Sequence, residues 1–285
     1  MNLEKLMTHR IPGQRCELTA RDAILYALGV GYGDRPGNES DLSLVYEGSP
    51  SFQVLPSMAN VLAHPGLWIA HPDLGIDWLS TLHGEQGFEM FKRLLPGTAY
   101  TSRYEVRGVL DKGPGKGALM FVRKELREEA TGELACTVDS TYFLRRDGGC
   151  GGTLHEAPAP HAIPDREPDQ TVELATLPQA ALIYRLSGDL NPLHADPAKA
   201  ALAGFERPIL HGLCSLGVST RAVLRAACEG DGSRLRSLQL RFTAPVYPGE
   251  TLVTDLWRDA GVISFRTRVA ERDIVVLDKG RATLF

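Results

Sequence analysis

A carboxylate, an amide and an imidazole, groups that can together hold a water and move a proton, stand close together in the C-terminal half of this sequence. Asp189, Asn191 and His194 lie within residues 188–194, which read Gly-Asp-Leu-Asn-Pro-Leu-His. Glycine and proline in such a segment predict a tight turn, which would fold the carboxylate and the imidazole toward one point where both hold one water. The pattern indicates acid–base chemistry.

Gly212 adds a fourth group to this set. It precedes an apolar stretch that predicts a helix running to about Ala227. The first turn of a helix presents unpaired N–H groups and the positive end of the helix dipole, which suit an oxygen that becomes negative during a reaction. Glycine also lets a ligand approach the backbone closely. Together with Asp189 and His194, this donor points to proton chemistry beside a carbonyl group.

Each of these features also has a purely structural explanation. Residues 188–192 alone make a good turn, and a lone histidine is more often structural than catalytic. Asp196-Pro197 is interpreted as the cap and first residue of a short helix through Ala203, without a chemical role. A metal site built from Asp189, His194 and His211 has no supporting ligand spacing, so we expect no metal.

Composition and charge exclude several classes of partner. The 285 residues are 43% hydrophobic and 23% charged, which is typical of a globular protein with a sizeable core. The net charge of -4, with both signs interspersed, predicts neither nucleic-acid nor membrane binding. No apolar run approaches a membrane span, and the first ten residues lack the apolar core of a signal peptide. Five scattered cysteines without a CxxC pair favour reduced thiols and a cytoplasmic protein.

Residues 147–170 divide the chain, because their glycine and proline runs sustain neither a helix nor a central strand. We therefore expect an N-terminal domain over 1–146, a linker over 147–170 and a C-terminal domain over 171–285. Strand-like segments occur in both domains. They are residues 104–110, 118–122, 238–242, 263–269 and 274–277.

The two domains resemble each other in order as well as content. Each opens with a short helix, for which Thr19 with Asp22 and Thr176 with Gln179 have capping-box spacing. Each then carries Leu-His-Gly, at 82–84 and 210–212, interpreted as the start of a second helix. A buried helix followed by an antiparallel sheet, present twice, predicts a duplicated α+β fold. The N-terminal copy is longer between its helix and Leu-His-Gly, which indicates an insertion or remodelling.

The segment from Tyr184 to His194, with Phe-Glu-Arg-Pro-Ile-Leu-His-Gly-Leu-Cys at 205–214, resembles the signature of type 2 (R-specific) enoyl-CoA hydratases among the MaoC-like hot-dog proteins. Weaker matches extend the resemblance over almost the whole chain, to the hydratase unit of peroxisomal multifunctional enzymes of type 2. They occur in the same order, at 26–31, 46–48, 83–86, 110–113 and 245–249.

The resemblance implies a double hot-dog, with two hot-dog domains in one chain, each a helix wrapped by an antiparallel sheet. It implies one active site per chain, because residues 33–36, the nearest match to the motif in the N-terminal domain, lack the histidine. In such proteins the first domain shortens its central helix and leaves a tunnel for medium to long acyl chains. The resemblance also implies a homodimer. It implies no metal or redox cofactor, and coenzyme A counts as part of the substrate.

The resemblance also assigns roles. Asp189 and His194 match the catalytic pair that holds the water added across the double bond of a trans-2-enoyl-CoA, giving a (3R)-3-hydroxyacyl-CoA. The sequence does not decide which residue removes the proton of the water and which serves the α-carbon, because they share one water and titrate together. Asn191 matches a residue that hydrogen-bonds near the reacting atoms, and Gly212 matches the backbone donor to the thioester oxygen.

Weaker matches place further site residues, most of them in the N-terminal domain. Glu47 occupies the Tyr-Glu-Gly position, from which a glutamate approaches the substrate in this family. An exposed loop carboxylate without a role in the site explains the tripeptide equally well. His83, Gly84 and Lys112 match positions that contact coenzyme A, and a lysine in a glycine-rich turn suits a phosphate. A helix-start histidine is the alternative for His83. Phe242 matches a pocket residue, although its alternating strand is also typical of core.

Three other functions use part of this pattern. A hot-dog thioesterase hydrolyses acyl-CoA but does not need the set of Asp189, Asn191 and His194. A dehydratase of a specialised 3-hydroxyacyl-CoA runs the same reaction in reverse, and the sequence does not give the direction. A non-catalytic acyl-CoA-binding protein would not need the acid–base pair. We therefore expect a hydro-lyase of fatty acid β-oxidation type that hydrates trans-2-enoyl-CoA reversibly.

Overall fold

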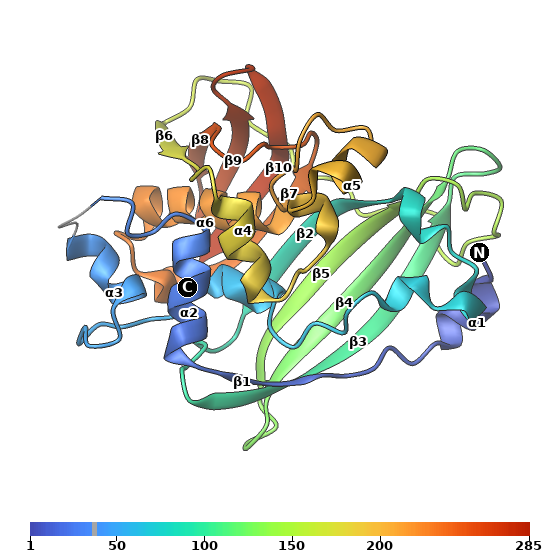
Figure 1. The fold of residues 1–285 in the computed structure, drawn as a ribbon, viewed down its shortest axis with the longest axis horizontal. Helices are drawn as coiled ribbons and strands as arrows, with labels where there is room; N and C mark the ends of the chain where they lie inside the picture. The colour runs from blue at the N-terminus through green and yellow to red at the C-terminus, as the bar shows by residue number, and fades with distance from the viewer. Residues whose placement is uncertain (36–38) are drawn as a thin grey trace.

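The computed structural model, which describes residues 1–35 and 39–285, is built on one ten-stranded antiparallel sheet (Figure 1). Pro36, the last residue of the motif-like segment 33–36, therefore lies outside the described residues. The strand order is β1-β3-β4-β5-β2-β7-β10-β9-β8-β6. The strands are β1 (Arg15–Leu18), β2 (Thr81–Met90), β3 (Thr98–Asp111), β4 (Ala118–Glu128), β5 (Leu134–Leu144), β6 (Gln170–Ala175), β7 (Leu235–Phe242), β8 (Thr251–Asp259), β9 (Val262–Val269) and β10 (Ile274–Leu284). The five predicted strand segments are confirmed.

The pairing of β2 with β7 joins the two halves into this single sheet. Glu85 lies opposite Arg241 in the register, and the Arg241 Nη2 donates to Glu85 Oε1 at 2.6 Å. Residues 145–169, between β5 and β6, contain no helix or strand. In that segment Thr153 and Leu154 donate their N–H groups to the Val109 carbonyl, so the connection is tied to β3.

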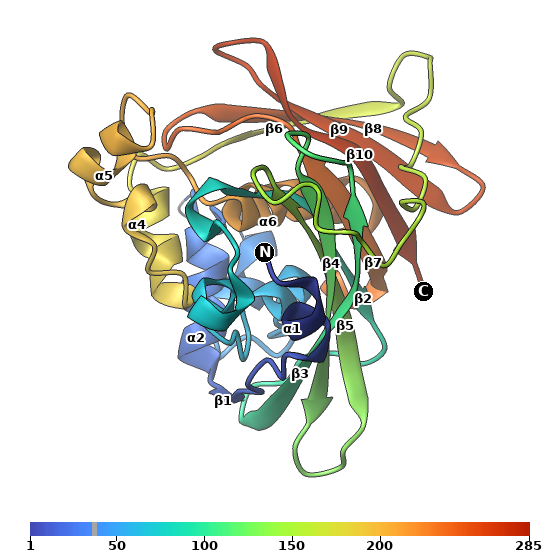
Figure 2. The same ribbon diagram turned by 90° about the vertical axis from the view of Figure 1, so that its right-hand side faces the viewer.

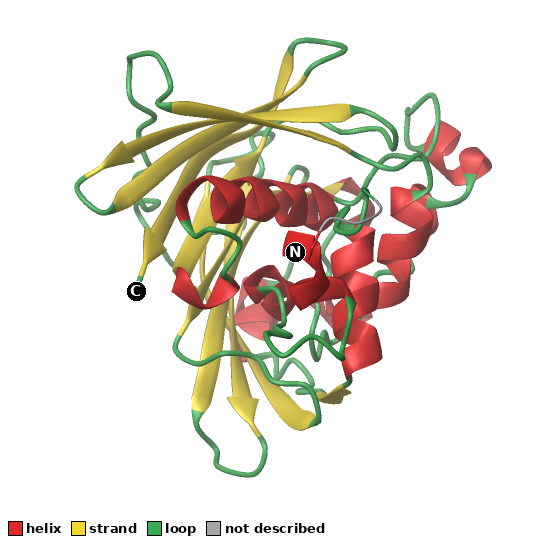
Figure 3. Ribbon diagram, turned by 90° about the vertical axis from the view of Figure 1, so that its left-hand side faces the viewer, coloured by secondary structure: helices red, strands yellow, loops and turns green. Residues whose placement is uncertain are grey.

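The helices gather on the inner side of the curved sheet, as views from two opposite sides show (Figures 2 and 3). Among them α6, the longest of the described helices, contacts β6, β7, β8 and β10, and its residues 214–224 are all buried. Its bounds, Gly212–Ala227, confirm the prediction. The others are α1 (Leu3–Thr8), α2 (Ala20–Gly29), α3 (Leu42–Val45), α4 (Ala180–Tyr184) and α5 (Pro197–Leu202). No helix of the described residues is long and apolar enough to cross a membrane.

The N-terminal half departs from the prediction of a second helix at its Leu-His-Gly. Residues 82–84 lie in β2, which pairs with β5 on one side and β7 on the other. Where the C-terminal half has α6, a single 3-10 segment, Pro56–Asn60, contacts β2, β5 and α6. Long-range pairing of Leu82 and His83 with β5 has overridden the helix signal of the local tripeptide.

A buried lysine marks the point where this short segment ends. Lys124 on β4 donates from Nζ to the carbonyls of Ala59 (2.6 Å), Asn60 (3.1 Å) and Leu62 (3.0 Å). Burial lowers the pKa of Lys124 to about 8. The lysine satisfies carbonyls that a longer helix would have bonded to its own next turn.

The two opening helices, α2 and α4, pack against each other but are capped differently. Thr19 and Asp22 form the predicted capping box of α2. The box predicted for Thr176 and Gln179 is wrong, because the Thr176 hydroxyl donates to the Glu250 carbonyl at 2.8 Å and α4 begins after Gln179 without a side-chain cap. The cap at Asp196 with Pro197 as the first residue of α5 is confirmed, since Asp196 accepts from Ala198 N at 2.8 Å.

A fully buried arginine ties α6 to the N-terminal half. The Arg221 Nη2 lies 3.0 Å from Asp34 Oδ2 and 3.7 Å from Asp41 Oδ2, and Nη1 donates to the Gly31 carbonyl. Its guanidinium also lies over the Tyr32 ring, at 4.8 Å. One buried cation thereby pairs with the carboxylates of both Asp34 and Asp41.

Replacing Arg221 by alanine should therefore destabilise the whole fold. Removing one partner of a buried ion pair leaves charges uncompensated, at a cost of about 3–5 kcal/mol. The measurement is urea unfolding of the purified protein. As the control, Arg236→Ala breaks the half-exposed ion pair with Glu89 and should cost less than about 1 kcal/mol. Equal losses in both variants would contradict the structural role of Arg221.

Candidate functional site

A tight turn after α4 presents Asp189 to solvent. A 3-10 segment, Arg185–Ser187, ends at Gly188, whose φ of 124° is the region that favours glycine. The Asp189 Oδ1 accepts from the Asn191 N–H at 3.1 Å, and Asn191 Oδ1 accepts from the Leu193 N–H at 3.1 Å. Both polar side chains thus build the turn itself, and each keeps free capacity for a ligand.

His194 ends this turn with its ring fixed in one orientation. Its Nδ1 lies 2.8 Å from the Ile209 carbonyl, which only accepts, so Nδ1 carries the hydrogen and Nε2 keeps its lone pair. The side chain is buried, and this burial lowers the pKa of His194 below its ordinary value of 6.5, against the opposing influence of the Ile209 carbonyl and the Asp189 charge. The neutral imidazole is therefore a base ready at neutral pH.

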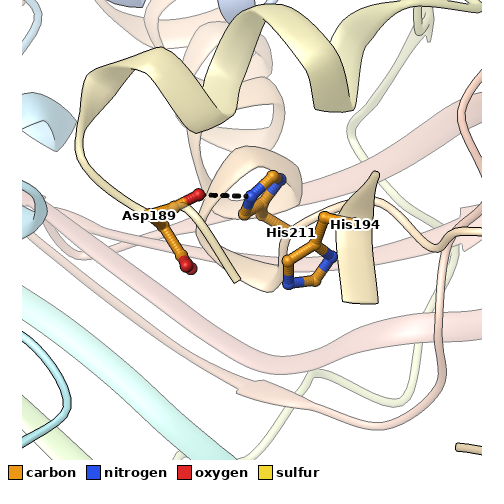
Figure 4. A group of neighbouring side chains, drawn as sticks. All are labelled: Asp189, His194 and His211. Carbon is orange, nitrogen blue, oxygen red and sulfur yellow. Dashed lines mark hydrogen bonds between the residues drawn. The ribbon is translucent and has the colours of Figure 1, made fainter. Parts of the chain in front are cut away.

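His211 completes a group of three side chains (Figure 4). Its Nε2 donates to the backbone carbonyl of Asp189 at 3.2 Å, and its ring stacks on that of His194 with centroids 3.7 Å apart. One ligand atom from each of Asp189, His194 and His211 lies within 4.8 Å of the others. Two hydrogen bonds to one water span about 4.5 Å, so the group has the dimensions to share a water.

The same three residues have the spacing for a metal ion but not the orientation. The two imidazole planes are inclined by only 27°, and nitrogen lone pairs lie in the ring plane, so the rings do not aim at one point. The His194 Nδ1 and the His211 Nε2 already hold backbone carbonyls. These residues therefore fit a metal poorly as they stand.

The start of α6 supplies backbone donors next to His211. Among the described residues, the N–H groups of Gly212 and Leu213 have no hydrogen-bond acceptor, and the cap residue His211 makes no side-chain cap. A Cβ at Gly212 would lie 3.1 Å from the Phe242 ring, so glycine leaves both the ring and the N–H in place. The helix end is thus open to an incoming oxygen.

The N-terminal half contributes an aromatic wall around His83. Its ring lies 5.0 Å from Phe242 and 5.2 Å from Tyr142 between centroids, and its Nε2 is 2.7 Å from Gln86 Oε1. Burial lowers the pKa of His83, while the Asp189 charge acts in the opposite direction. Gly84 sits at the register shift between His83 and Glu85, where a Cβ would lie 3.2 Å from a backbone carbonyl.

Two predicted site residues lie apart from the Asp189 group. Glu47 is an exposed residue two positions beyond α3, and no contact with Asp189 or His194 is found in the described part of the chain. Lys112 lies in the turn between β3 and β4, with Nζ 4.8 Å from the Phe143 ring centre. Within residues 1–35 and 39–285 it has no ion-pair partner, so its charge is available. The roles of both residues stay predictions.

Comparison with known proteins covers both halves. Residues 16–146 match the family model of the MFE-2 hydratase 2 N-terminal domain, and residues 160–279 match that of the MaoC-like domain. Enoyl-CoA hydratase 2, peroxisomal, from Arabidopsis thaliana is 37% identical over 97% of this chain and 93% of its own. The mouse peroxisomal multifunctional enzyme type 2 is 39% identical over 97% of this chain, which spans 38% of that longer protein.

Solved structures agree with the sequence matches. The crystal structure of a MaoC-like dehydratase from Phytophthora capsici aligns with a TM-score of 0.89 at 34% identity, covering 100% of this chain and 98% of that one. A Mycobacterium tuberculosis protein described as having a double hotdog fold aligns with a TM-score of 0.58 at 21% identity, covering 96% and 94% of the two chains. The double hot-dog fold is thereby confirmed.

Gly212→Ala tests the open helix end. The added methyl meets the Phe242 ring, so the ring or the N–H must shift, and kcat/KM should fall by about 10- to 100-fold with little loss of stability. Steady-state kinetics on an acyl thioester measures this fall. The double variant Gly212→Ala/Phe242→Ala relieves the contact and should recover part of the loss; a single variant with unchanged kcat/KM would contradict the assignment.

Proposed function

Because the chain belongs to the MaoC-like hydratase 2 family, we propose that it catalyses the reversible (R)-specific hydration of trans-2-enoyl-CoA to (3R)-3-hydroxyacyl-CoA. The observation that carries the proposal is the separation of Asp189 and His194, whose ligand atoms lie within 4.8 Å, the span of one shared water. The unpaired N–H of Gly212 beside them supports the same reaction, since hydration builds negative charge on a thioester oxygen.

The geometry supports a specific order of events. Asp189 and His194 hold the water, and the Nε2 lone pair of His194 accepts its proton as the hydroxyl adds to the β-carbon. The electron pair of the double bond moves to the thioester oxygen, where the Gly212 N–H stabilises the enolate. The acid–base pair then returns one proton to the α-carbon. Water is consumed whole, so the pair ends in its starting protonation state.

The remaining site residues take supporting roles in this proposal. Asn191 orients the water or the enoyl group with the amide nitrogen that the turn leaves free. His83, Gly84 and Phe242 border the thioester, which the contacts among His83, Phe242 and Gly212 support. Lys112 holds a phosphate of coenzyme A, which its unpaired charge supports. Glu47 approaches the substrate only if its loop moves toward Asp189.

We further propose that the chain acts as a homodimer with one active site per chain and no metal or redox cofactor. The stacked, already bonded imidazoles support the absence of a metal. The reverse reaction is the second candidate. A relative from Mycobacterium tuberculosis named 3-hydroxyacyl-thioester dehydratase Y is 42% identical over 93% of this chain, and dehydration uses the same groups in reverse.

The direct test is an assay of the purified protein on trans-2-enoyl-CoA of short and long chain. We expect loss of the conjugated-thioester absorbance without release of free thiol, and a (3R) product. Asp189→Asn should lower kcat by about 10²-fold or more, because the amide cannot take part in proton transfer. Thiol release would reassign the chain as a thioesterase, and inactivity on all chain lengths would overturn the proposal.

The pH dependence of kcat/KM tests the state of His194. The mechanism needs a neutral imidazole, and the folded protein lowers the pKa of His194 below 6.5 by burial. Activity should therefore be present above this lowered pKa and be lost as the pH falls through it, with a midpoint below 6.5. An acidic limb with its midpoint above 6.5 would contradict the assignment of His194 as the base.

A further inference from the structure

His211 lies at the centre of the site, yet no step of the proposed reaction uses it. We propose that His211 is a positioning residue, which holds the Asp189 turn by a hydrogen bond and keeps His194 dry by stacking on it. The inference rests on the proposed function and extends it. Three observations carry it: the bond to Asp189, the stack on His194 and the buried surroundings of the ring.

The hydrogen bond joins two elements that are far apart in sequence. His211 caps α6, and its Nε2 donates to the Asp189 backbone carbonyl, 22 residues earlier, at 3.2 Å. Within the part of the chain that the structure describes, the Asp189 side chain is held only by the Asn191 N–H of its own turn. Among the described residues, the hydrogen bond from His211 therefore connects the turn of the catalytic aspartate to the helix that carries the Gly212 donor.

The stack determines which side of His194 meets water. A centroid separation of 3.7 Å leaves no room for a water between the two rings. His211 is 1% exposed, and its pKa is lowered to about 4 by burial and by the neighbouring His194, so the platform is uncharged at neutral pH. An uncharged ring shields His194 from solvent on one face without repelling the proton that His194 gains during reaction.

The surroundings of His211 are aromatic and contain buried hydroxyls. The Tyr184 ring lies 5.0 Å from that of His211, and the Tyr26 ring lies 5.7 Å from that of Tyr184. The hydroxyls of Tyr26 and Tyr184 and the Nδ1 of His211 are buried and have no hydrogen-bond partner among the described residues. This aromatic packing by α2 and α4 holds the ring in place, and its Nε2 donates to the Asp189 carbonyl.

The charged and titratable groups that act on the two imidazoles are few. Burial lowers the pKa of both histidines. The Asp189 charge acts against this in both, and the Arg185 charge lowers the pKa of His211 further. Tyr184, on α4, faces the His211 ring. Burial raises the pKa of Tyr184, so its hydroxyl stays neutral. His83, from β2, also senses the Asp189 charge. A substitution at His211 should therefore change the pKa of His194 mainly by changing how far water reaches the His194 ring.

Two substitutions separate the two parts of this role. His211→Phe keeps a ring over His194 but has no N–H for the Asp189 carbonyl. It should lower kcat by about 10- to 100-fold, with KM within about threefold of wild type and the acidic limb of the pH profile unmoved. His211→Ala removes the ring as well and admits water beside His194. Its acidic limb should move to higher pH, toward 6.5, because burial is what lowers the pKa of His194.

The control is Ser219→Ala, which removes a buried hydrogen bond of α6 to Thr267 away from the site and should leave the pH profile unchanged. Wild-type activity on enoyl-CoA is measured first, so that its absence counts against the proposed function alone. With an active wild type, a kcat of His211→Phe within twofold of normal would overturn the tether. If the acidic limb of the pH profile stays in place in His211→Ala, or moves equally in both variants, the His211 ring does not shield His194 from water.

Discussion

The helix α6 is buried in the curve of the sheet, and this burial fixes the helix end around which the site is built. Residues 214–224 of this helix are enclosed, so its position is set by strands from the C-terminal half and by the 3-10 segment of the N-terminal half. Its first turn, in contrast, opens toward the Asp189 turn. A rigid helix with one solvated end provides N–H donors whose direction needs no reorganisation when charge develops on a substrate.

The two halves use the same sheet for different purposes. The C-terminal half keeps the long helix and the acid–base pair. The N-terminal half has only Pro56–Asn60 in the corresponding place, where Asn60 accepts from Gln86 at 2.7 Å and Gln86 in turn holds His83. Lys124 satisfies the carbonyls at the end of this short segment. The short segment of the N-terminal half thus carries a polar group that orients the wall of the site around His83.

Local patterns predicted α6 and the capping box of α2 correctly, but they failed for the cap at Thr176 and for Leu-His-Gly at 82–84. The bounds of α6 follow from its apolar run, whereas Leu-His-Gly at 82–84 forms strand because Leu82 and His83 pair with β5, a partner distant in sequence that no local pattern shows. Lys124 lies on the same face of β4 as the buried Met120, Val122 and Leu126, so a charge on the inward face of a strand was the available signal. The stack of His211 on His194 depends on the crossing of two segments and leaves no sign in spacing.

The central claim is that the water held by Asp189 and His194 adds to a carbon–carbon double bond. Isotope tracing tests it directly, by mass spectrometry of the product formed from trans-2-enoyl-CoA in H₂¹⁸O and, separately, in D₂O. We expect one ¹⁸O in the β-hydroxyl group and one deuterium on the α-carbon, with the thioester intact. Incorporation of ¹⁸O into a free carboxylate would contradict it, since the water would then have attacked the thioester carbonyl.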